Sequence, residues 1–401
     1  MSGSALSKAR LGRLHLAMTR YVDAGAVPGV VTLVSCGDEL YVDAIGDKAF
    51  AAVDPMRRDT IFRIASMTKP ITAVAAMILV EECRIRLDEP IDSWVPELAG
   101  RKVLKRIDGP LEDTVPASRP LTVRDLLTFR MGFGITFGPP TGSPIEQAAT
   151  ASRVLSLPPG PPLAADEWLK RLGNLPLMYQ PGERWIYHTS YDVLGMLIAR
   201  ASGQSLETFM RERILAPLGM KDTAFSVPEA KLARFPACYQ PDAQGTGIEL
   251  GDAPDRSAWG KPPLFPQGGG GLVSTVDDYH AFGRMMLNGG RHGKERILSR
   301  ASVEAMTTNQ ITQEQKDAAS FLPGFFESNG WGLGVSMVTK RTDVAAQPGQ
   351  FGWSGVFGST WFSDPREDLV AILMIQRMYF GPEPAGIWSH FSTGVYQALE
   401  D

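Results

Sequence analysis

The hydrophobic pattern at the start of the chain predicts a helix followed by a β-hairpin. Residues 5–24 carry apolar side chains at nearly helical spacing, which predicts an amphipathic helix. A Pro28-Gly29 break follows, and residues 30–35 are rich in β-branched side chains, which favour strands. Gly37-Asp38 is a turn signal, so residues 40–45 are predicted to form the returning strand.

The middle of the chain is predicted to be mostly helical, with long loops between the helices. Residues 71–82 are apolar on all sides, as in a helix that is buried all round. Further helical patterns cover residues 121–130, 189–201 and 205–215. Breaker-rich stretches at 131–144 and 157–163 predict long loops, which are often functional in compact proteins. Residues 233–271 are rich in Pro and Gly and predict irregular structure.

Strand patterns return in the C-terminal part of the chain. Strands are predicted at residues 332–338, 358–362 and 369–376, a turn at 364–367, and a final helix at 385–400. Strands at both chain ends favour one sheet built from both termini. The expected fold class is α/β (α+β), with an antiparallel sheet flanked by the N- and C-terminal helices. The sheet domain is expected to be discontinuous, residues 1–95 and 271–401, with a mostly helical domain inserted at 96–270.

Composition excludes several classes of partner. The 401 residues are 44% hydrophobic and 21% charged, which is ordinary for a globular protein. The net charge of −4 offers no attraction for nucleic acid or an anionic membrane. Three widely spaced cysteines give no disulfide framework. Because there is neither the apolar core of a secretory signal nor a membrane-spanning stretch, we expect a cytoplasmic protein. The oligomeric state is left open.

The first candidate for chemistry is the Ser66-x-x-Lys69 spacing at the start of the apolar helix. Residues i and i+3 share a helix face, which would put the Lys69 amine beside the Ser66 hydroxyl. An amine whose pKa is lowered by burial can take the proton of a serine nucleophile. Chance alone predicts about one such spacing in this chain, so a helix N-cap by Ser66 with a solvated Lys69 is an alternative. Pro70 is tolerated only in the first helical turn, so Ser66 has to lie at its very start.

Tyr187 is the second candidate, between a Pro181-Gly182 turn and a predicted helix. A phenol needs a neighbouring cation to act as a base, and Lys69 would be that cation. The alternative is a structural tyrosine, one of nine in the chain. For the adjacent His188, a structural or surface role is favoured over a catalytic one.

The third candidate is Trp353-Ser354-Gly355-Val356, after a Pro348-Gly349 turn. A small residue and a glycine at a strand edge allow a substrate carbonyl to approach the backbone closely. The backbone N–H groups of Val356 and Ser66 would then form an oxyanion hole. The alternative is a plain glycine-containing turn.

Other well-known motifs are missing from the sequence. It has no Gly-x-Ser-x-Gly elbow, no HExxH motif, and no P-loop lysine after the glycine run at 268–271. The five histidines are scattered and give no support for a metal site. We therefore expect neither a metal nor another cofactor.

Taken in chain order, the three candidates resemble motifs of the class C β-lactamases, the D-alanyl-D-alanine peptidases and the β-lactamase-like carboxylesterases of bacterial esterase family VIII. The resemblance covers residues from about 10 to about 400 and includes PGVVTLVSCGDELYVDAIG, TIFRIASMTKPITAVAAMILVEE, LTVRDLLTFRMGFG, YQPGERWIYHTSYDVLG, GGGGLVSTVDDYHAFGRMMLNGG and WSGVFGSTWFSDP. The order and separation of these motifs match the family, which is far more specific than any one of them. A β-lactamase/transpeptidase-like fold is implied.

The resemblance also implies a role for each candidate. Ser66 would be acylated, and Lys69 and Tyr187 would share the base role, with the first proton acceptor left undecided. Tyr187 would protonate the leaving alcohol and activate the deacylating water. The expected oxyanion and substrate-binding residues are Val356, Trp353, Ser354, Gly355, Thr189, His188 and Phe133.

Two departures from the β-lactamase pattern favour the esterase branch. The Tyr-x-Asn motif reads Tyr187-His188-Thr189, without the amide, and Lys-Thr-Gly reads Trp353-Ser354-Gly355. Without that lysine, nothing charged is left to bind the carboxylate of a β-lactam. Aromatic residues in predicted loops would suit an apolar acyl or alcohol group: Phe133, Phe137, Phe325 and Phe326.

The leading hypothesis is a serine carboxylesterase for small to medium esters, with a small-molecule ester as its partner. An amidase, an acyltransferase and a weak β-lactamase are alternatives on the same fold. A non-catalytic binding or scaffold protein is a further alternative, against which the intact Ser66, Lys69 and Tyr187 argue.

Overall fold

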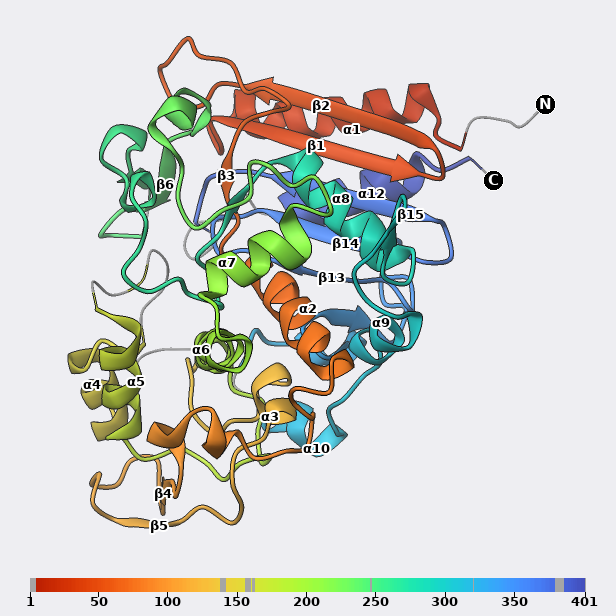
Figure 1. The fold of residues 1–401 in the computed structure, drawn as a ribbon. Helices are drawn as coiled ribbons and strands as arrows, with labels where there is room; N and C mark the ends of the chain where they lie inside the picture. Colours follow the sequence, from red (N-terminus) through yellow and green to blue (C-terminus); the bar gives the residue numbers. More distant parts are fainter. Residues whose placement is uncertain are drawn as a thin grey trace.

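A seven-stranded antiparallel sheet occupies one side of the molecule, and a larger helical region lies beside it (Figure 1). The computed structural model describes residues 5–137, 142–155, 160, 163–245, 247–319, 321–378 and 386–400. Parts of the predicted loops 131–144 and 157–163, and residue 385 of the predicted final helix, lie outside these residues.

The helices are α1 (Lys8–Asp23), α2 (Thr68–Glu81), α3 (Val123–Leu127), α4 (Pro144–Ala151), α5 (Ala165–Gly173), α6 (Thr189–Ser202), α7 (Leu206–Met210), α8 (Val276–Leu287), α9 (Arg300–Met306), α10 (Gln313–Asp317), α11 (Phe325–Ser328) and α12 (Ile387–Gln397). The large sheet contains β1 (Gly29–Cys36), β2 (Glu39–Gly46), β11 (Asn329–Trp331), β12 (Ser336–Val338), β13 (Phe351–Ser354), β14 (Thr360–Asp364) and β15 (Leu369–Met374). Short two-stranded pairs are β3 (Phe62–Arg63) with β8 (Val273–Ser274), β4 (Lys102–Leu104) with β5 (Thr114–Pro116), β6 (Cys238–Pro241) with β7 (Ile248–Asp252), and β9 (Arg291–His292) with β10 (Glu295–Arg296).

The sheet joins the two ends of the chain, in the order β11-β12-β13-β14-β15-β1-β2. Strand β1 is buried along its whole length and pairs with β2 on one side and β15 on the other, with Val31 opposite Met374. A strand covered on both faces is expected to be apolar throughout rather than alternating. The antiparallel sheet built from both ends of the chain confirms the predicted fold class. The division of domains at residues 95/96 and 270/271 stays a prediction.

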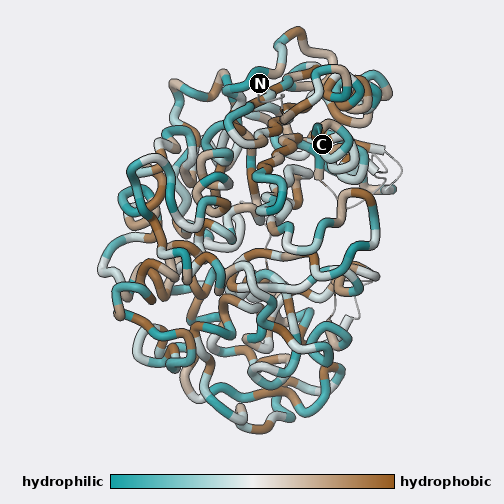
Figure 2. The backbone as a smooth tube through the Cα atoms, turned by 90° about the vertical axis from the view of Figure 1, so that its right-hand side faces the viewer, coloured by the Kyte–Doolittle hydropathy of each residue, from teal (hydrophilic) through white to brown (hydrophobic). Residues whose placement is uncertain are grey.

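Helices cover both faces of the sheet. Helices α1 and α12 pack together on one face, where the β-carbon of an alanine at Gly394 would lie 2.7 Å from Leu14. Helix α8 covers β14 and β15 on the other face. Hydrophobic backbone segments run through both the sheet and the helical region (Figure 2), because one large apolar core connects the two. In the described part of the chain, no helix is long and apolar enough to cross a membrane.

The structure corrects several sequence expectations near the C-terminal strands. The predicted strand at 332–338 is a strand only at its end, as β12, because residues 332–335 connect it to the preceding β11 and include Gly334, whose φ is +106°. A left-handed conformation of this kind breaks a strand and favours glycine. Strand β13 is not among the predicted strands, because its four residues lie between a Pro-Gly pair and a further glycine. Residues 233–271, predicted to be irregular, contain the β6–β7 hairpin.

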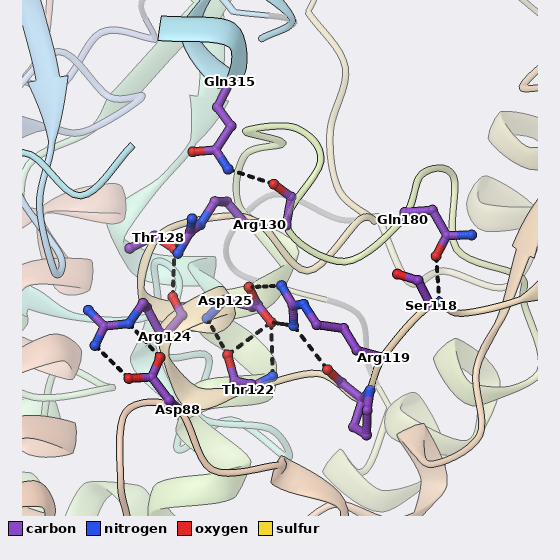
Figure 3. A network of polar contacts seen from close by, with 12 residues as sticks. Asp88, Ser118, Arg119, Thr122, Arg124, Asp125, Thr128, Arg130, Gln180 and Gln315 are labelled. Carbon is purple, nitrogen blue, oxygen red and sulfur yellow. Dashed lines mark hydrogen bonds and ion pairs between the residues drawn. The ribbon is translucent and has the colours of Figure 1, made fainter. Parts of the chain in front are cut away.

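A polar network fixes the start of α3 in the helical region (Figure 3). Asp125 is 1% exposed and accepts hydrogen bonds from the backbone N–H and the hydroxyl of Thr122, at 3.0 and 2.9 Å. The Arg119 guanidinium pairs with both oxygens of the same carboxylate, at 2.5 and 2.9 Å. Thr122 and Asp125 thereby form a capping box.

Replacing Asp125 with alanine is expected to lower the free energy of unfolding by about 2–3 kcal/mol. The loss combines a helix cap with a buried ion pair, and it is limited because Arg119 is 40% exposed and can be solvated. Urea denaturation measures it. Glu167→Gln is the control, since its ion pair with Arg171 is exposed and is expected to matter by less than about 0.5 kcal/mol. Equal losses in the two variants would contradict this reading of the network.

Candidate active site

Ser66 lies in a short 3₁₀ turn, Ala65–Met67, that leads directly into α2. Pro70 is the third residue of α2, within the first turn, where the ring removes no helical hydrogen bond. Ala65 adopts a φ of +42°, which is uncommon for a residue with a β-carbon. Strained backbone of this kind gathers at functional sites. Ser66 lies at the wall of a cavity that Tyr187 and Trp353 also line.

The end of β13 lies against the backbone just before Ser66. A β-carbon at Gly355 would come within 2.4 Å of the Ile64 carbonyl oxygen, so this approach requires glycine. Val356 follows and lines the same cavity as Ser66. Within the described residues, the backbone N–H groups of Ser66 and Val356 donate to no acceptor. Both are therefore available to a substrate oxygen, as an oxyanion hole requires.

Lys69 is fully buried one helical turn from Ser66. Its Nζ lies 2.9 Å from Ser66 Oγ and 3.2 Å from His188 Nδ1, and it also donates to the Gly269 carbonyl oxygen. The same nitrogen lies 4.5 Å from the centre of the Tyr187 ring. Burial lowers the pKa of Lys69 well below its usual range, and the negative charge of Asp192 opposes this effect only in part.

Tyr187 brings its phenol to the same place from the segment before α6. The indole N–H of Trp353 donates to Tyr187 Oη at 2.8 Å. Burial raises the pKa of Tyr187, while its hydrogen bonds with Ser66 and Trp353 act in the opposite direction. The phenol is therefore neutral near pH 7, so it can donate and relay protons but is not a deprotonated base in the resting enzyme.

A strained turn holds Tyr187 in position. His188 has φ +85° and ψ −70°, and the Thr189 N–H bonds back to the Tyr187 carbonyl at 3.3 Å, which defines a γ-turn of the rare strained class. The Ile135 N–H donates to the same carbonyl at 2.9 Å. Gly134 lies so close to it that a β-carbon would come within 2.3 Å. The Tyr187 backbone is thus fixed from two sides.

Three polar contacts behind Lys69 were not predicted from the sequence. They come from Asp192, Gly269 and Gln267. Asp192 is 2% exposed; its Oδ1 accepts from the Gly269 N–H at 2.9 Å and its Oδ2 from Gln267 Nε2 at 3.4 Å. Its Oδ2 also lies 3.6 Å from His188 Nε2. Burial raises the pKa of Asp192. The one signal in the sequence was the i,i+4 spacing of His188 and Asp192, which puts both on the same face of a helix.

The predicted substrate-binding residues divide into two groups. Trp353, Ser354, Gly355 and Val356 line the cavity together with Ser66 and Tyr187. His188 and Thr189 are buried behind it.

The predicted aromatic positions also differ in where they lie. Phe137 and Phe325 line the cavity, and Phe326 lies outside its lining, against the Trp185 ring. Phe133 is fully buried in the core and does not line the cavity. The reason is that Gly132, with φ +86°, bonds to the 178–179 backbone and turns this segment inward.

The cavity beside Ser66 has a volume of about 720 Å³. Its described lining includes no Asp, Glu, Lys, Arg or His. Aromatic rings dominate its walls: Phe137, Tyr187, Phe321, Phe325, Phe351, Trp353, Trp361, Phe362 and Trp388. Walls of this kind favour uncharged, apolar groups, because a charge would lose its hydration without gaining a partner.

Comparison with known proteins extends these observations. The sequence model of the family described as Beta-lactamase matches residues 15–391. Protein Rv1367c of Mycobacterium tuberculosis is 39% identical over 88% of this chain and 87% of its own. Esterase EstB of Burkholderia gladioli is 32% identical over 88% of this chain and 87% of its own. Lovastatin esterase of Penicillium rubens is 28% identical over 88% of this chain and 90% of its own.

Solved structures show the same fold. EstCE1, described as a hydrolase with promiscuous acyltransferase activity, superimposes with a TM-score of 0.76 at 23% identity, covering 97% of this chain and 99% of its own. Because the family match spans nearly the whole sequence and is joined by an esterase of more than 30% identity, the chain belongs to the beta-lactamase family and is a serine hydrolase.

Proposed function

We propose that the protein is a serine carboxylesterase that hydrolyses small to medium carboxylic esters through an acyl intermediate on Ser66. The observation that carries the proposal is the contact of Lys69 Nζ with Ser66 Oγ at 2.9 Å, beside an uncharged aromatic cavity. EstB and lovastatin esterase, both named as esterases, support the same activity.

Acylation begins with neutral Lys69. The opposite directions of the two pKa shifts favour Lys69 over Tyr187 as the first proton acceptor, since burial makes the amine easier to deprotonate and the phenol harder. Ser66 Oγ attacks the ester carbonyl carbon, and its proton passes to Lys69 Nζ. The carbonyl oxygen gains the negative charge and accepts from the N–H groups of Ser66 and Val356.

Tyr187 completes both half-reactions. When the C–O bond to the alcohol breaks, the Tyr187 hydroxyl protonates the leaving oxygen and takes a proton back from the Lys69 ammonium. In deacylation the flow reverses: a water gives its proton to the Tyr187–Lys69 pair while its oxygen attacks the acyl carbon. The proton then returns to Ser66 Oγ as the ester bond to the enzyme breaks.

The cavity favours an ester over a β-lactam or a peptide carboxylate. Its described walls offer no cation for a carboxylate, and the position of the β-lactamase lysine is held by Trp353, whose N–H is engaged by Tyr187 Oη at 2.8 Å. These features support placement in the family VIII esterase branch.

Hydrolysis of p-nitrophenyl butyrate, combined with labelling by a fluorophosphonate, tests the proposal. We expect ping-pong kinetics and a single adduct that peptide mass spectrometry places on Ser66. Nitrocefin, which carries a carboxylate, is expected to be turned over far more slowly. Efficient nitrocefin hydrolysis with little esterase activity, or an adduct on another residue, would overturn the assignment.

The pH dependence of kcat/KM provides an independent prediction. Because kcat/KM reports the free enzyme, it is expected to fall as the pH drops through the pKa of Lys69, where the amine gains its proton and can no longer accept one. Burial lowers that pKa, so the acid limb should lie well below the 10.5 of an ordinary lysine. Stopped-flow or steady-state rates between about pH 5 and 10 measure it. A rate that keeps rising up to pH 10 would contradict the prediction.

A further inference from the structure

The structure assigns His188 and Asp192 a positioning role: together they hold the Lys69 amine so that its lone pair faces the Ser66 hydroxyl. The inference rests on the proposed function, since it concerns how Lys69 takes the proton of Ser66. It adds two residues that touch neither substrate nor nucleophile and act through Lys69.

The first step of the argument is the hydrogen-bonding capacity of a neutral amine. Without its third proton, Lys69 Nζ has two N–H donors and one lone pair. The structure surrounds it with three polar neighbours: the Gly269 carbonyl, His188 Nδ1 and Ser66 Oγ. A carbonyl only accepts, so it takes one N–H. If His188 Nδ1 takes the other, the lone pair is left for Ser66 Oγ at 2.9 Å.

The second step concerns the histidine tautomer. For Nδ1 to accept from Lys69, the ring proton has to be on Nε2. Nε2 lies 3.6 Å from Asp192 Oδ2, longer than a hydrogen bond but close enough for the buried carboxylate to favour the proton on that side of the ring. The two ring nitrogens of His188 thus face Lys69 and Asp192 respectively.

The third step is that Asp192 also controls the other acceptor. Its Oδ1 binds the Gly269 N–H at 2.9 Å, while the carbonyl of the same residue accepts from Lys69. A β-carbon at Gly269 would come within 2.9 Å of Asp192 Oδ1, so this close approach depends on glycine. One buried carboxylate thus places both groups that occupy the two N–H donors of Lys69.

The negative charge of Asp192 also supports proton transfer from Ser66 to Lys69. When Lys69 accepts the Ser66 proton it becomes an ammonium in a buried site, and a nearby negative charge stabilises it. Around Lys69 the titratable groups are Tyr187, His188 and Asp192, and the Tyr279 hydroxyl of α8 donates to the Met67 carbonyl at 2.8 Å. The negative charge of Asp192 favours the ammonium form of Lys69 and so raises its pKa.

Asp192→Asn is the first test, because the amide keeps the shape and the acceptor for Gly269 but removes the charge. We expect kcat/KM for p-nitrophenyl butyrate to fall about 10–100-fold, a part of the 10²–10⁴ that a positioned general base contributes. The loss should fall on kcat rather than KM. The acid limb of kcat/KM should move to lower pH, since a charge that raises the pKa of Lys69 is lost.

The control is Ser190→Ala, on the same helix. Ser190 is also fully buried, and its hydroxyl donates to the Leu126 carbonyl at 2.8 Å, away from Lys69. It should leave both kcat and the acid limb unchanged. A folded Asp192→Asn enzyme whose acid limb stays in place would overturn the inference.

His188 provides a second pair of variants. Asparagine tolerates positive φ and can offer its amide oxygen to Lys69, whereas alanine offers no acceptor. His188→Asn should therefore retain much more activity than His188→Ala, and equal losses would overturn the positioning role.

Nitrogen-15 spectra of the wild-type protein with labelled histidine give a test that needs no variant. A buried neutral histidine with the proton on Nε2 is expected for His188, and a proton on Nδ1 would refute the inference. Failure of the proposed function itself has a different signature, because the fluorophosphonate adduct would then be absent from Ser66 in the wild-type protein.

Discussion

Replacing Ser66 with alanine is expected to lower kcat for p-nitrophenyl butyrate by about 10⁴- to 10⁶-fold. Without Oγ no acyl-enzyme forms, and removal of a nucleophile typically costs this much because the other residues act only through it. The oxyanion N–H groups and the cavity are kept, so a small rate above the uncatalysed reaction should remain. Steady-state assays with fluorophosphonate labelling measure the loss, and the label should no longer attach.

The matched control for Ser66→Ala is again Ser190→Ala, which removes a buried hydroxyl of equal size from α6. It should retain turnover and labelling. Undiminished hydrolysis by the Ser66 variant would mean that the nucleophile is elsewhere.

Replacing Tyr187 with phenylalanine is expected to reduce kcat by about 10²- to 10⁴-fold, the contribution of a positioned general acid–base. The ring contacts that support the fold are preserved, including the stacking on Trp185 with centroids 5.5 Å apart. What disappears is the hydroxyl that protonates the leaving alcohol and relays protons to Lys69. Both the burst of p-nitrophenol and the subsequent steady state should slow, since Tyr187 serves both half-reactions.

Trp353→Phe separates the phenol from its hydrogen-bond donor. This variant keeps an aromatic ring but loses the indole N–H that bonds to Tyr187 Oη. That bond lowers the pKa of Tyr187, so its loss should raise the pKa further and slow turnover about tenfold, as expected for one hydrogen bond to a developing charge.

A Tyr187→Phe enzyme with a kcat within threefold of wild type would contradict the role given to the phenol, because Lys69 would then transfer the protons without it.

Local spacing made part of the site predictable. The i,i+3 relation of Ser66 and Lys69 holds in any helical start, and the structure places their polar atoms 2.9 Å apart. The convergence of Tyr187 on them joins parts of the chain more than a hundred residues apart, which no periodicity can reveal. That expectation came from the order of motifs shared with a known family. The roles of these residues, and the cytoplasmic location, stay predictions.

The rest of the site could not be predicted, because it depends on where the backbone turns in three dimensions. Phe133 was expected in the pocket, but the left-handed Gly132 turns it into the core. Asp192 sits in an apolar helical run, where an acidic residue reads as surface, yet it is buried against the Gly269 peptide. Strand β13 is too short for its period to stand out between glycines.

The pairing of β1 with β15 also determines when the large sheet can be completed during translation. In this pairing Cys36 of β1 lies opposite Leu369 of β15. At ~5–20 residues per second, β1 therefore leaves the ribosome roughly 20–70 s before β15. Throughout that interval one edge of this largely apolar strand lacks its neighbour. A chain that ends after residue 46 but before residue 369 is therefore expected to expose this unpaired strand edge and to aggregate.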